Sequence, residues 1–165
     1  MRHTTFAIAA LLALITLAER PVAAKVGMIT LEELTDGAEF IGIVRVESVG
    51  FGIRYLFQGH ATATVLERWK GQARRWIRFG STSTWSCDIS DAHTGEEALV
   101  FTEGRQLAHA GRGRMPIFTR DGRRLAAVGP EVRLPATLVV EGGPKPDSDF
   151  IRAVSVDDLR TVIRK

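Results

Sequence analysis

The densest group of side chains with chemical potential lies in a short polar segment near the middle of the chain. Cys87, Asp91 and His93 occur there within seven positions. A thiolate, an imidazole and a carboxylate can together bind zinc, and a thiol beside a histidine base can act as a nucleophile. The chain lacks the paired Cys-x-x-Cys or His-x-x-x-His spacings of strong zinc motifs and any signature of a known cysteine enzyme. We therefore interpret the segment as a polar connection between strands, with a metal- or thiol-dependent enzyme centred on Cys87 and His93 as the alternative.

Cys87 is the one cysteine of the chain, so no internal disulfide can form. The neighbouring Asp88 disfavours a thiolate, and the closest lysine or arginine in sequence is Arg78, nine positions away. A low thiol pKa needs a positively charged environment. We therefore expect an unreactive thiol, a monomeric protein, and neither a bound metal nor a cofactor.

A second candidate site combines basic and aromatic side chains. Arg75 and Arg78 lie close in sequence to Trp69 and Trp76, and further basic residues occur at positions 68, 70 and 74. Basic residues interleaved with aromatic ones are typical of small barrels that bind single-stranded nucleic acid. The alternative for both tryptophans is a place in the core or at its rim.

The first 24 residues have the features of a secretory signal peptide. Arg2 gives the start a positive charge, an apolar run covers residues 6–18, and small residues precede a cleavage site after Ala24. The apolar run is shorter than the roughly 20 residues that cross a bilayer. We expect a product in the periplasm or outside the cell. Export argues against nucleic acid, so an anionic envelope polymer or an exported protein is the expected partner of Trp69, Trp76, Arg75 and Arg78.

Removal of residues 1–24 from the 165-residue chain leaves 141 residues, enough for one domain with a core of its own. The removed segment carries two arginines and one glutamate, which lowers the formal net charge from +3 to +2. Such a small excess does not by itself indicate a nucleic-acid partner. We expect residues 25–165 to form a single domain.

Most of this domain has the pattern of short strands. Gly42 inside the first strand predicts a bulge or bend, and Asp121-Gly122 is a strong signal for a tight hairpin. Alternating apolar and polar residues predict strands over residues 38–49, 60–66, 75–80, 97–102, 117–120, 123–128 and 132–140. Pro135 is expected to confine the last of these to a sheet edge or to split it.

A short helix is predicted near each end of the domain. Thr30 and Glu33 form a capping box that predicts a helix over residues 31–36. Ser155 with Asp158 gives a second cap before a terminal helix. Strands at this spacing with glycine at the bends predict a mainly β fold, a small antiparallel barrel or sandwich.

Three segments in order carry a resemblance to a known fold. Residues 65–71, VLERWKG, end a strand and enter a turn; Cys87 follows a serine- and threonine-rich stretch; residues 95–101, GEEALVF, run from a turn into a strand. This order resembles small exported bacterial proteins with an OB-like β-barrel, related in fold to tissue inhibitors of metalloproteinases and netrin modules. The inhibitors begin with a cysteine that binds the protease zinc, whereas the predicted mature chain begins with Lys25. The resemblance therefore implies the barrel but not the inhibitory activity. Because the chain also lacks known catalytic motifs, we expect an exported, non-catalytic binding module.

The predicted cleavage site gives a direct test. We expect the exported protein to begin at Lys25, because Val22 and Ala24 are the small residues that a signal peptidase reads before the cut. Intact-mass analysis of exported protein measures this end. Recovery of the full 165-residue chain from a membrane fraction contradicts the prediction.

Overall fold

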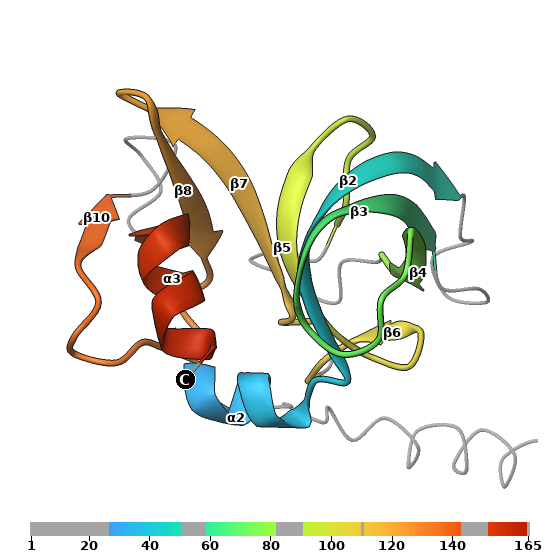
Figure 1. Cartoon of the computed structure of the whole chain (residues 1–165). Helices are drawn as coiled ribbons and strands as arrows, with labels where there is room; N and C mark the ends of the chain where they lie inside the picture. Colours follow the sequence, from blue (N-terminus) through green and yellow to red (C-terminus); the bar gives the residue numbers. More distant parts are fainter. Residues whose placement is uncertain (1–26, 51–58, 82–90, 110, 143–151, 165) are drawn as a thin grey trace, which may run out of the picture.

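The computed structural model describes residues 27–50, 59–81, 91–109, 111–142 and 152–164 (Figure 1). The predicted signal peptide and Cys87 lie outside these residues. Among them, no helix is both long and apolar enough to cross a bilayer. The elements in chain order are β1 (Ile29–Thr30), α2 (Leu31–Gly37), β2 (Phe40–Gly50), β3 (His60–Lys70), β4 (Trp76–Gly80), β5 (Glu97–Glu103), β6 (Gln106–Leu107), β7 (Arg114–Arg120), β8 (Arg123–Val128), β9 (Val132–Arg133), β10 (Val140–Gly142), β11 (Arg152–Ser155) and α3 (Val156–Ile163).

The fold is mainly β, with one large antiparallel sheet and two short helices. The sheet runs in the order β10-β11-β8-β7-β5-β2-β3-β4, and β6 also pairs with β5. One edge of β5 pairs with β2 along its length, while the other edge is divided between β7 and β6. In Figure 1, β2, β3 and β5 curve around β4 and β6, and α3 lies beside β8. The strand ladders of the described residues do not form a closed barrel.

Local signals explain where several elements begin, bend and end. Thr30 and Glu33 form the expected capping box at α2, and Asp121 and Gly122 take the positive φ angles of a tight hairpin between β7 and β8. Gly42 marks a register shift of β2 against β3, where a side chain would collide with the backbone of Glu67. Residues 132–140 are split into two short strands, one of the two outcomes expected from Pro135: β9 pairs with β1 and β10 pairs with β11. Pro135 lies between them and has no N–H to continue a ladder.

Two apolar cores lie on opposite faces of β2 and β5. On β5, Leu99 and Phe101 face the first core, whereas Ala98 and Val100 face the second. Alternation of side chains along a strand requires this division. The first core is covered by α2 and α3 together with β8 and β11, and the second is enclosed by β2, β3 and β4.

A buried ion pair joins β7 to the start of β5. The side chain of Arg114 is 2% exposed, and its Nε donates to Oε1 of Glu96 at 2.9 Å while a second guanidinium nitrogen contacts Oε2. Arg114 is in register with Val100, so its side chain lies on the face of the second core. Two parallel hydrogen bonds to a carboxylate are the arrangement in which an arginine tolerates such burial.

This ion pair gives a stability prediction. We expect Glu96→Ala to lower the free energy of unfolding by about 3–5 kcal/mol, because it removes the carboxylate that balances a buried charge. Urea unfolding measures the change. Glu141→Ala is the matched control, since Glu141 pairs with Arg123, whose side chain is 57% exposed, and is expected to cost less than about 1 kcal/mol. Equal losses in the two variants contradict the prediction.

Candidate functional site

Strand β4 presents two different faces. Ile77 and Phe79 are 5% and 0% exposed and pack into the second core, whereas Trp76 is 63% exposed. Arg78 alternates with them and shares the outward side with Trp76. The alternation expected from the sequence is confirmed, and it places an aromatic and a cationic side chain together on the surface.

A pocket of about 480 Å³ lies beside this strand. One wall is formed by residues 74–78, which lead into β4 and form its first part. The other wall is the turn between β5 and β6. We call this site the arginine pocket; its lining residues are Arg74, Arg75, Trp76, Ile77, Arg78, Gly104 and Arg105.

A smaller pocket of about 200 Å³ continues from it along β4 and β6. Arg78 and Arg105 line both pockets. His60 also lines the smaller one, and its Nε2 contacts the guanidinium of Arg78. The two pockets are therefore neighbours that share two cationic residues.

The residues that line the arginine pocket include four arginines and no acidic residue. Glu39 accepts a hydrogen bond from the backbone of Gly104 at the turn, but it does not line the pocket. Within the described part of the chain, no ion pair involves the four arginines of the pocket. Arginines elsewhere do pair with a carboxylate, namely Arg45, Arg114, Arg123, Arg124 and Arg160.

The structure brings together three of the four residues expected at a binding face. Arg75, Trp76 and Arg78 line the same pocket, but Trp69 is not part of its lining. Trp69 packs against the first core, where its indole N–H donates to Glu67 at 3.3 Å. The reason is that β3 continues to Lys70, past its pairing with β4, into the neighbourhood of α3.

Sequence reasoning missed Arg105 as a member of the site. Its backbone carbonyl accepts a hydrogen bond from Gly80 at the end of β4, with an N–O distance of 2.9 Å. That contact brings the turn between β5 and β6 beside β4. A pairing between residues so far apart in sequence leaves no local pattern, so only the neighbouring glycine at 104 indicated a turn.

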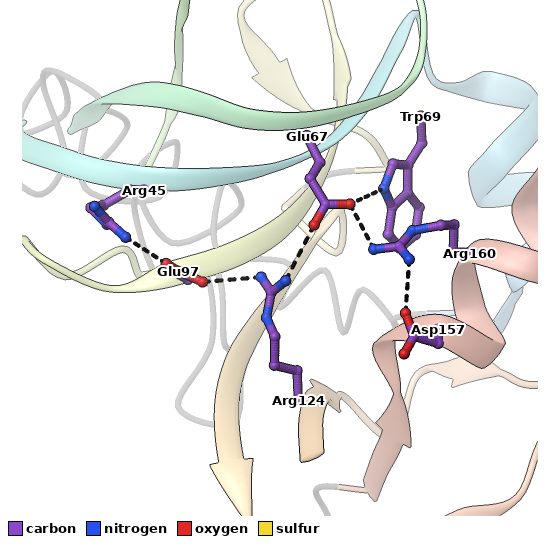
Figure 2. A network of polar contacts seen from close by, with 7 residues as sticks. All are labelled: Arg45, Glu67, Trp69, Glu97, Arg124, Asp157 and Arg160. Atoms are coloured by element: carbon purple, nitrogen blue, oxygen red, sulfur yellow. Dashed lines mark hydrogen bonds and ion pairs between the residues drawn. The ribbon is translucent and has the colours of Figure 1, made fainter. Parts of the chain in front are cut away.

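Trp69 belongs instead to a polar network that joins distant elements (Figure 2). Glu67 lies at its centre and accepts hydrogen bonds from Trp69, Arg124 and Arg160. The Arg160 guanidinium also lies 5.5 Å from the centre of the Trp69 ring, a cation–π distance. The network holds β3, β8 and α3 together, and its remaining contacts are Arg45 to Glu97, Arg124 to Glu97 and Arg160 to Asp157.

The surroundings of Glu67 lower the pKa of its carboxyl group below 4.5. Burial acts in the opposite direction and raises it. The hydrogen bond from Trp69, the positive charge of Arg160 and the hydrogen bonds from Arg124 and Arg160 together outweigh burial. The ionised carboxylate is therefore the form that stabilises the fold.

The lowered pKa gives a pH-dependent stability prediction. We expect Glu67→Gln to lower the free energy of unfolding at pH 7 by about 1 kcal/mol, since several charge-assisted hydrogen bonds weaken at a partly exposed site. The wild-type protein should be more stable than the variant above pH 4.5. This difference in the free energy of unfolding should disappear as the pH falls through the lowered pKa of Glu67 in the folded state. Urea unfolding at a series of pH values measures the difference. As a control, Asp157→Asn should lower the free energy of unfolding by less, because the Asp157 side chain is 81% exposed. If the loss of stability in Glu67→Gln persists unchanged to pH 2, the ionised Glu67 carboxylate is not its cause.

The segment with Cys87, Asp91 and His93 is only partly described. Cys87 lies outside the described residues. The side chain of His93 is 77% exposed, and its Nδ1 lies 3.5 Å from Oε2 of Glu96. Among the described residues, no three histidine, cysteine, aspartate or glutamate side chains are grouped so as to hold a metal ion.

Comparisons of the chain with protein-family models, with curated proteins and with solved structures find no match. Among the described residues, the arginine pocket is the feature that points to a function. Guanidinium groups bind carboxylate, sulfate and phosphate oxygens through paired N–H donors. An exposed tryptophan adds a flat apolar surface next to them. This combination is suited to the binding of an anion.

Proposed function

We propose that the chain is an exported, non-catalytic binding module that holds an anionic partner in the arginine pocket. The observation that carries the proposal is the gathering of four guanidinium groups around one pocket without an ion pair among the described residues. Like charges placed side by side repel one another. An anionic partner relieves this repulsion and gains charge-assisted hydrogen bonds at the same time.

The shape of the site supports a macromolecular partner. Both pockets lie along one side of β4 and share Arg78 and Arg105, so the cationic surface is elongated. Trp76 stands exposed at this surface and can contact an apolar part of the partner. An acidic exported protein or an anionic envelope polymer fits these features. Export itself is supported by the signal-peptide pattern of residues 1–24.

We further propose an OB-like barrel as the frame of the site. An OB-fold is a five-stranded, partly open Greek-key barrel. The ladders connect β5 with β2, β2 with β3, and β3 with β4, while β6 pairs with β5. The hydrogen bond from Gly80 to Arg105 spans the remaining step from β4 to β6. This order supports a distant relationship in fold to the inhibitor and netrin modules, whose N-terminal cysteine is replaced here by the predicted start at Lys25.

The arginines of the pocket can be tested as a group. We expect the purified protein to bind dextran sulfate or poly-L-glutamate, measured by isothermal titration calorimetry, and to bind more weakly as salt is raised. The double variant Arg78→Gln/Arg105→Gln should lose at least about tenfold in affinity, because two charge-assisted contacts are removed.

The control variant also loses two positive charges, but outside the pocket. Arg45→Gln/Arg123→Gln removes two exposed arginines that pair with Glu97 and Glu141, and its affinity should stay within about twofold of wild type. Neutral dextran should not bind. Equal losses in the two double variants mean that overall charge rather than the pocket binds the polymer, which contradicts the proposal.

A further inference from the structure

The backbone of β4 faces the arginine pocket along one edge. In an antiparallel ladder, the N–H and C=O groups of alternate residues point to the same neighbouring strand. Val65 donates to the carbonyl of Arg75, and Ser81 donates to the carbonyl of Gly59. The odd-numbered residues of β4 therefore point their backbone groups toward β3, and the even-numbered residues point theirs away from it.

One of these outward groups already has a partner. The N–H of Gly80 donates to the carbonyl of Arg105 at 2.9 Å, which holds the end of β4 against β6. Two and four residues earlier, Arg78 and Trp76 lie along the arginine pocket. In the ladders of the described residues, β4 is an end strand of the sheet. The backbone donors and acceptors of Trp76 and Arg78 thus border the pocket at a sheet edge.

We propose that an extended acidic segment of a partner protein binds here by adding a strand along Trp76 and Arg78, on the edge of β4 that faces away from β3. The inference rests on the proposed function and names its partner class. A sheet edge supplies main-chain hydrogen bonds to an added strand, while pockets along it select alternate side chains. A polysaccharide offers no polypeptide backbone to continue the ladder. The four guanidinium groups beside the edge supply the complementary charge.

The geometry of β4 specifies the side chains of such a segment. Every pairing in the main sheet is antiparallel, so an added strand is expected to be antiparallel as well. Residues directly opposite one another in a ladder have side chains on the same face. An acidic residue then lies opposite Arg78, an apolar residue two positions on lies opposite Trp76, and a second acidic residue follows beside Arg74. The expected motif is acidic-x-apolar-x-acidic.

The experiment uses a capped synthetic peptide, Thr-Glu-Thr-Val-Thr-Glu-Thr, and two N-methylated analogues of the same charge. In an antiparallel pair, the N–H groups of the valine and the glutamates point toward β4 and those of the threonines point away. We expect methylation at the valine and one glutamate to lower affinity by about tenfold. Methylation at two threonines should leave it within about twofold. Calorimetry on the purified protein measures all three.

Hydrogen exchange of the protein provides a second readout. Bound peptide should slow exchange of the Trp76 and Arg78 amides, and leave the Ile77 amide, which already pairs with β3, unchanged. Equal affinities of the two analogues overturn strand addition while charge-based binding, the proposed function, still stands. Binding of dextran sulfate without any peptide binding also overturns it and identifies a polymer as the partner. If neither dextran sulfate nor any peptide binds, the proposed function fails as well.

Discussion

Strand β5 has only seven residues, yet it buries side chains on both of its faces and pairs with three neighbouring strands. Four consecutive apolar residues, Ala98 to Phe101, are fully buried, two on each side. Its first half pairs with β7, which leads to the part of the sheet covered by helices. Its second half pairs with β6, which leads back toward β4. The position of the pocket depends on this division, because β6 follows the turn that carries Arg105.

The arginines of the chain serve two different purposes. Arg114 is buried against Glu96, and Arg124 and Arg160 converge on Glu67, so each of these guanidinium groups connects elements that are distant in sequence. Those around β4 line a pocket and form no ion pair among the described residues. Positive charge that is compensated inside the fold stabilises it, whereas the charge gathered at the pocket remains available to another molecule. The small formal net charge of the whole chain hides this separation.

Local chemistry made part of the structure predictable. The cap at Thr30, the hairpin at Asp121 and the alternation that exposes Trp76 each depend on neighbouring residues, and each was predictable. Contacts between distant segments were not. The indole of Trp69 has the same sequence signal as that of Trp76, and only the packing of β3 near α3 separates their environments. Arg105 enters the site through one backbone contact with Gly80, which no periodic pattern encodes.

The double role of Arg105 couples occupancy of the site to the shape of the sheet. Its carbonyl accepts the hydrogen bond that holds the end of β4, and the same residue lines both pockets. A ligand that fixes the side chain restricts the same residue whose backbone closes β4 onto β6. If occupancy strengthens that closure, thermodynamic linkage requires the closure to strengthen binding by the same factor.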